Sequence, residues 1–133
     1  MTYSLKNTRP LDSNQLKELF ESNGLYEDQL HLFMGFFKSP YVLSCWDNEK
    51  LIGVVRSIDD ENFTAYIDNL LVHKDYQDQG LEKQLFEFML LGLSNFKYIY
   101  FIPNNKKQIR LCKRNGFSSK RGMYLQKING RSI

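Results

Sequence analysis

The spacing of apolar residues divides the chain into segments with the period of a helix and segments with the period of a strand. Residues 2–9 fit a short edge strand. Over 12–23 the period is helical, with Asp12 as the expected N-cap and Gln15 as its partner in a capping box. A second helix is predicted over 27–39, where Leu and Phe recur at helical spacing until a proline follows. The first part of the chain therefore reads as one strand and two helices.

The pattern changes to the period of strands at residue 41. Three segments rich in β-branched and aromatic residues, 41–46, 51–58 and 63–73, are separated by short polar turns. Strands joined by turns of this length pair with their neighbours in antiparallel fashion. We therefore expect an antiparallel meander of three strands.

The helical period returns after Gly80. This helix is apolar over so much of its circumference that we expect it to be buried on more than one side. A strand over 98–102, a basic helix over about 105–115 and a strand over 123–128 complete the chain. The predicted order is β-α-α-β-β-β-α-β-α-β, with no internal repeat and no linker. We therefore expect a single α+β domain over residues 1–133.

Composition narrows the class of protein. The chain has 133 residues, of which 42% are hydrophobic and 25% charged, as in an ordinary globular domain, so a disordered or collagen-like chain is excluded. Eighteen Lys and Arg residues against 15 Asp and Glu residues give a net charge of +3. That mild excess argues against a nucleic-acid partner, which would require many phosphate contacts.

The two cysteines and the longest apolar run indicate whether the protein binds a metal and in which cellular compartment it is found. Cys45 and Cys112 form no CxxC pair and have no histidine cluster near them, so we expect no metal site and no disulfide. The longest apolar run, over 32–37, is far shorter than the roughly 20 residues of a membrane helix. The N-terminus has no signal-peptide core, and we therefore expect a cytoplasmic protein with no membrane partner.

The segment over 66–85 carries the chemistry that can be recognised from residue types. A predicted strand runs into a short polar turn, and the turn opens the buried helix. The first-turn amides of a helix have no intrahelical partners and lie at the positive end of its dipole. Gly80 has no Cβ, so an anion such as a pyrophosphate could approach the backbone there. An ordinary strand-to-helix loop shares these features, and the segment alone leaves both interpretations open.

Two further recognisable segments lie on either side of this one in the sequence. The sequence VHKDYQDQGLE occupies 72–82, a polar hairpin precedes it at 47–56, and Asn105 is followed by LCKRNGF at 111–117. In that order they resemble motif A, the second and third strands, and motif B of the GNAT superfamily of acyl-CoA-dependent N-acyltransferases. The resemblance covers about residues 41–118. It is nearest to small bacterial members and to the short arylalkylamine-type acetyltransferases of plastids.

The resemblance implies both a fold and a reaction. The fold would be a mixed sheet of six or seven strands flanked by four helices, with coenzyme A in a V-shaped opening between two central strands. The reaction would be transfer of an acetyl group from acetyl-CoA to a primary amine of a small molecule or peptide, without a metal. Members of the family often form dimers, so a homodimer is part of this expectation.

The resemblance also assigns residues to the cofactor. Backbone amides of motif A would hold the pyrophosphate, backbone of the preceding strand would pair with the pantetheine arm, and motif B would add one contact. The cofactor-binding residues implied in this way are Leu70, Leu71, Val72, Gln77, Asp78, Gln79, Gly80, Leu81, Glu82, Lys83 and Asn105.

The catalytic candidates are Asp68 and Cys112. A general base assists because the attacking amine must lose a proton, and the resemblance places an acidic residue at Asp68, acting through water. Strand alternation puts Tyr66, Asp68 and Leu70 on one face and Ile67, Asn69 and Leu71 on the other. Cys112 stands where the family commonly has the Tyr that protonates the departing thiolate. A different Tyr, water, or plain apolar packing of Cys112 are the alternatives.

Three positions depart from the family pattern. Glu82 replaces a Gly or Ala, Lys74 replaces a Pro, and Cys112 replaces the Tyr. A carboxylate at Glu82 would crowd and repel a phosphate unless its side chain turned outward.

An active acetyltransferase has two rivals, of which the first is motivated by Glu82 and Cys112 and the second by the basic helix. One is a degenerate domain that binds acyl-CoA as a sensor or interaction module without efficient turnover. The other is a nucleic-acid-binding domain that uses the basic helix with Lys106, Lys107 and Arg110. That helix has two further interpretations, a solvated face and a surface that attracts the 3′-phosphate of coenzyme A.

Overall fold

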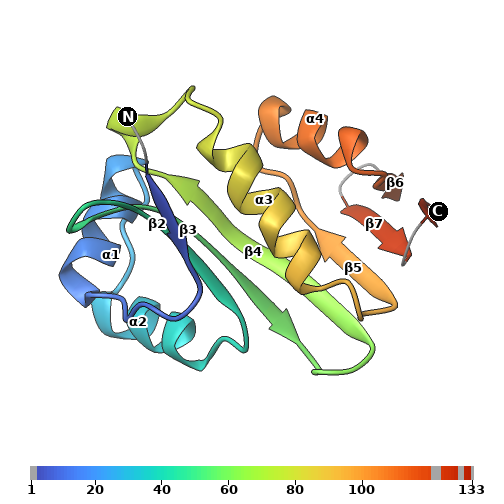
Figure 1. The fold of residues 1–133 in the computed structure, drawn as a ribbon, viewed down its shortest axis with the longest axis horizontal. Helices are drawn as coiled ribbons and strands as arrows, with labels where there is room; N and C mark the ends of the chain where they lie inside the picture. The colour runs from blue at the N-terminus through green and yellow to red at the C-terminus, as the bar shows by residue number, and fades with distance from the viewer. Residues whose placement is uncertain (1–2, 121–123, 129–130, 133) are drawn as a thin grey trace.

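The computed structural model describes residues 3–120, 124–128 and 131–132, with side chains described through residue 119. Helices and strands alternate much as the periodicity predicts (Figure 1). In chain order the elements are β1 (Ser4–Lys6), α1 (Ser13–Ser22), α2 (Gln29–Lys38), β2 (Val42–Asp47), β3 (Lys50–Asp59), β4 (Thr64–Val72), the single 3₁₀ turn η1 (Lys74–Tyr76), α3 (Leu81–Gly92), β5 (Tyr98–Phe101), α4 (Lys106–Arg114), β6 (Ser118–Lys120), β7 (Tyr124–Ile128) and β8 (Arg131–Ser132).

The strands form one mixed sheet in the order β1-β2-β3-β4-β5-β7-β6, with the short β8 against β7. The expected meander is confirmed, because β2, β3 and β4 pair in antiparallel fashion. The pairing of β4 with β5 is parallel. Parallel neighbours need a crossover, which α3 supplies. Within the described residues the continuous path holds seven strands, so the expected mixed sheet of six or seven strands is confirmed.

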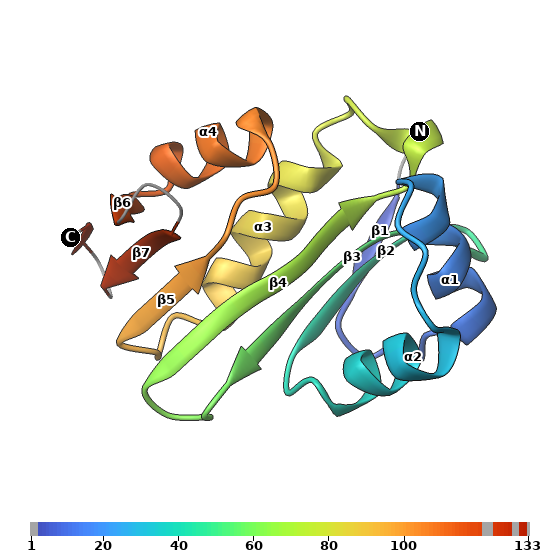
Figure 2. The ribbon, with the colours of Figure 1, turned by 180° about the vertical axis from the view of Figure 1, so that it is seen from behind.

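Helices cover the sheet on both faces and enclose two separate hydrophobic clusters. The helices α1 and α2 lie on one face, and α3 and α4 lie on the other (Figures 1 and 2). On the α3 side the cluster includes Leu85, Phe86 and Leu70. On the other side a smaller cluster includes Leu16 and Phe36. The first cluster holds the cofactor half expected from motifs A and B.

The strand-face assignment for β4 is correct up to Asp68 and wrong beyond it. Ile67 is buried against the α3 side and Asp68 points to the opposite face, as expected. At Asn69 the backbone turns left-handed, with φ at +53°, and the register against β3 shifts. This β-bulge inserts a residue and reverses the alternation. Leu70 therefore packs in the same cluster as Ile67, and Leu71 packs against the other cluster.

Several smaller expectations also change. Asp12 caps α1 by accepting from the backbone N–H of Gln15 at 2.9 Å, but the Gln15 side chain does not close a capping box. Its amide bonds instead to the β2–β3 turn, donating to the Glu49 carbonyl and accepting from the N–H of Leu51. The first strand is shorter than 2–9, and β6 was not expected.

Two predicted strands begin outside the described residues. The first was predicted to start at Thr2 and the last at Met123. Within the described ranges, no helix combines the length and the apolar character needed to cross a bilayer.

Candidate active site

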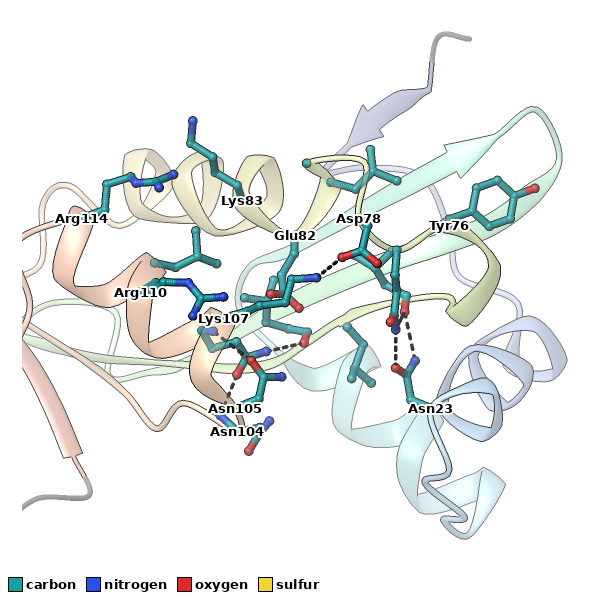
Figure 3. A pocket seen from close by; sticks show the side chains of 18 of the residues that line it. Asn23, Tyr76, Asp78, Glu82, Lys83, Asn104, Asn105, Lys107, Arg110 and Arg114 are labelled. Carbon is teal, nitrogen blue, oxygen red and sulfur yellow. Dashed lines mark hydrogen bonds and ion pairs between the residues drawn. The ribbon is translucent and has the colours of Figure 1, made fainter.

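A cleft of about 710 Å³ lies between the first turn of α3, the helix α4 and the end of β4 (Figure 3). Every residue predicted to bind the cofactor lines it except Gln79, whose side chain accepts from the Tyr3 hydroxyl at 3.1 Å. The lining residues are Asn23, Leu25, Leu70, Leu71, Val72, Tyr76, Gln77, Asp78, Gly80, Leu81, Glu82, Lys83, Asn104, Asn105, Lys107, Gln108, Arg110, Leu111 and Arg114.

The cleft exists because β4 extends further than β5, the strand that pairs with it in parallel. Pairing of β4 with β5 ends at Ile67 and Phe101, while β4 continues to Val72. The backbone of the last residues of β4 therefore faces α4 instead of another strand. This splayed pair is the expected V-shaped opening, and it leaves room for an extended ligand to lie along β4.

The N-terminus of α3 opens into this cleft. Gly80 precedes the helix with φ at +80°, a conformation that glycine adopts without strain, and provides no side-chain cap. No heavy atom outside its immediate neighbours lies within 4 Å of the point where a Cβ would stand. The first-turn amides and this empty cradle together suit an anionic group such as a pyrophosphate.

Charged side chains from both helices surround the cradle. Lys107 on α4 reaches Asp78 in the loop before α3, with 2.6 Å between Nζ and Oδ1 (Figure 3). Glu82 lies inside the cleft, where burial raises the pKa of its carboxyl group despite a hydrogen bond with Gln108 and the nearby Lys107. Its side chain is not turned outward but lies among the residues that line the cleft.

Asp68 lies on the other side of β4 from the cleft, at the first position after the β4–β5 pairing ends. Its side chain is 47% exposed, and one carboxylate oxygen lies 3.4 Å from Nη2 of Arg56. Arg56 also donates to the Asn69 side chain at 2.7 Å and to the Gly35 carbonyl of α2 at 3.3 Å. Arg56 therefore ties the β4 bulge to α2 and orients Asp68 beside the splay.

Cys112 does not face the cleft. It lies on α4 with no exposed surface, within the larger hydrophobic cluster. Burial raises the pKa of its thiol to about 12. A thiol so placed has no path to a group in the cleft, which favours apolar packing over proton donation.

Several lining side chains had not been predicted to bind the cofactor. Among them, Asn23 comes from the end of α1 and Gln108 from α4, and Lys107 was expected only as part of the basic helix. Gln108 is 2% exposed although it is polar, and it accepts from the N–H of Asn104. The one signal in the sequence was a polar residue on the apolar side of a basic helix, and that pattern does not reveal its partner. Among the described residues, no cluster of three or more metal-ligating side chains is found.

Comparison with known structures shows the same fold in several acetyltransferases. A probable acetyltransferase of Staphylococcus aureus superposes with a TM-score of 0.79 at 18% identity, covering 90% of this chain and 92% of that chain. A GNAT family protein of Streptococcus pneumoniae gives 0.76 at 16% identity, covering 88% of each chain. Arabidopsis thaliana NAA60, in complex with a bisubstrate analogue, gives 0.71 at 19% identity, covering 94% of each chain. At these identities the likeness establishes the fold.

The sequence itself places the chain in a family. No curated protein sequence matched. The family model described as "Acetyltransferase (GNAT) family" matches residues 7–117, which run from the segment after β1 through α4 and include both motifs that line the cleft. The chain therefore belongs to the acetyltransferase (GNAT) family.

Proposed function

We propose that this acyltransferase moves an acetyl group from acetyl-CoA to a primary amine of a small molecule or peptide. The observation that carries the proposal is the open α3 N-terminus beside a splayed β4. A bare helix N-terminus with a left-handed glycine suits the pyrophosphate, and the unpaired end of β4 suits an extended pantetheine arm. When bound, acetyl-CoA supplies an activated thioester.

The residues of this chain take three roles in the proposal. Main-chain amides of the loop before α3 and of its first turn, from Gln77 to Lys83, hold the phosphates, and the α4 cations Arg110 and Arg114 attract the remaining negative charge. The backbone of Leu70 to Val72 aligns the thioester. An amide of β4 near Leu70 stabilises the oxyanion that forms as the amine adds to the carbonyl carbon.

Asp68 receives the amine proton through water. It lies on the face of β4 opposite the cleft, so the amine would reach the thioester from the side of α1 and α2. The C–N bond forms first, and the C–S bond breaks as the oxyanion collapses to the amide. The departing thiolate takes its proton from solvent in this proposal, and Cys112 is set aside as the donor because it is buried away from the cleft.

Titration calorimetry with acetyl-CoA tests the cofactor site first. We expect micromolar binding, followed by turnover in an amine screen that detects the free thiol of coenzyme A. Absence of binding up to millimolar acetyl-CoA would refute the proposed cofactor.

A second candidate is a domain that binds acyl-CoA without efficient transfer. The inward position of Glu82 favours it, because a carboxylate facing the phosphates opposes tight binding. Binding without thiol release on any amine would select this function over the first.

A further inference from the structure

The cleft-side carbonyls of β4 are already occupied by side-chain amides. Gln108 on α4 donates from Nε2 to the Leu70 carbonyl at 3.2 Å. Asn23 at the end of α1 and Gln77 in the loop before α3 both donate to the Val72 carbonyl, each at 3.1 Å. Three carboxamides from three separate elements therefore pair with the stretch of strand that would receive the pantetheine arm.

The three amides are joined to the rest of the cleft. Gln77 also donates to the Asn23 side-chain oxygen at 2.9 Å, so the pair bridges α1 and the loop before α3 over the end of β4 (Figure 3). Gln108 is buried, and its amide also bonds with the Glu82 carboxyl. These side chains are held in place by more than their bond to the strand.

A carbonyl oxygen has two lone pairs and accepts two hydrogen bonds well. The Val72 carbonyl has both positions filled by Asn23 and Gln77. The Leu70 carbonyl is covered by a buried side chain. An added strand cannot pair with these carbonyls until the side-chain amides move.

We propose that Asn23, Gln77 and Gln108 form an amide latch that a ligand arm opens by exchanging its own amide N–H groups for theirs. The inference rests on the proposed function, because it takes the arm to be the diamide pantetheine. In the free protein the latch supplies hydrogen bonds to the carbonyls of β4. Only an arm that can replace those hydrogen bonds is able to displace it. The latch therefore lowers affinity and selects for the amide-bearing arm.

The test compares two ligands on the parent protein and three variants. Coenzyme A carries the arm, and adenosine 3′-phosphate 5′-diphosphate carries the same phosphates on the nucleoside without it. Gln77→Met and Gln108→Met keep the length of the side chain and remove its amide, and Gln84→Ala is the control, since Gln84 is on α3 outside the cleft lining. We expect each Met variant to bind coenzyme A about two- to tenfold more tightly, the range that one net hydrogen bond represents.

The nucleotide without the arm separates the latch from the cofactor site itself. Its affinity should be the same in Gln77→Met as in the parent protein, because it does not reach β4, and Gln84→Ala should bind both ligands as the parent protein does. Gln108→Met also removes the hydrogen bond with Glu82, so its affinity for coenzyme A is compared with its own affinity for this nucleotide. Coenzyme A binding that is unchanged or weaker in both Met variants, with a normal parent affinity, would overturn the latch and leave the proposed function standing. If the parent protein binds neither ligand, the proposed function fails. Gln77 is exposed, so its variant gives a folded protein even if Gln108→Met lowers stability.

Discussion

Removal of the Glu82 charge is the perturbation with the most direct consequence for the cofactor. Within the cleft mouth the charges of Asp78 and Glu82 face that of Lys107, and Lys107 is already held 2.6 Å from Asp78. Lys107 is therefore shared between two carboxylates, and this group carries a net negative charge when Glu82 is ionised. The substitution Glu82→Gln removes it and keeps the shape of the side chain.

The size of the effect follows from Coulomb's law. Two unit charges at about 5 Å repel by roughly 3 kcal/mol at an effective dielectric of 20. The nearby cations Lys83 and Arg110, together with solvent, screen about half of this. We therefore expect Glu82→Gln to tighten acetyl-CoA binding by about 1.4 kcal/mol, which is roughly tenfold.

The assay is calorimetric titration of both proteins with acetyl-CoA between pH 5 and pH 8. Burial raises the pKa of Glu82, so its neutral form persists above the pH at which an exposed Glu would ionise. As pH falls through that raised pKa, the parent protein loses the repulsion and its affinity approaches that of the variant. An equal or weaker affinity of Glu82→Gln at pH 8, or a ratio of affinities that is constant with pH, would refute the reasoning.

Three further substitutions separate structural from catalytic roles. Arg56→Met removes the hydrogen bonds that tie the β4 bulge to α2 and should lower the free energy of unfolding by about 2–3 kcal/mol in urea titrations; a loss below about 0.5 kcal/mol would show that the bulge holds without it. Asp68→Asn should lower kcat by about 10²- to 10⁴-fold and leave the Kd for acetyl-CoA unchanged, and an unaltered kcat would exclude Asp68 as the base. Cys112→Ala should keep kcat within about twofold and lower the free energy of unfolding by about 1–2 kcal/mol through the cavity it leaves, whereas a large loss of kcat in the folded variant would restore Cys112 as the proton donor.

The sequence was informative wherever a local rule determines the structure. Asp12 as the cap of α1 and the helix after Gly80 follow from hydrogen bonds and conformations within a few residues. The change of face in β4 could not be predicted, because Leu70, Leu71 and Val72 are all apolar and either alternation fits them. The β-bulge that decides between them includes Asn69, whose side chain accepts a hydrogen bond from Arg56, 13 residues earlier on another strand.

The residues of the candidate site likewise divide into those that the sequence could predict and those that it could not. Motif A could be placed because spacing and one glycine mark the loop that precedes α3. Gln108 and Asn23 could not be found, since each matters only through a hydrogen bond to β4 across 38 and 49 residues of chain. The inward side chain of Glu82 likewise depends on Gln108 and Lys107 opposite it.

The separation of the two hydrophobic clusters has a consequence for how the protein can change. One cluster supports the cofactor half under α3, and the other supports α1 and α2 on the side from which an amine would approach. Substitutions that share no partners have nearly additive effects on stability. Residues such as Leu16 can therefore be replaced with little direct effect on the packing under α3, whereas Phe36 contacts Arg56, which holds the β4 bulge. The sheet thus acts as a partition that would let one family keep a single acyl donor while its acceptors diverge.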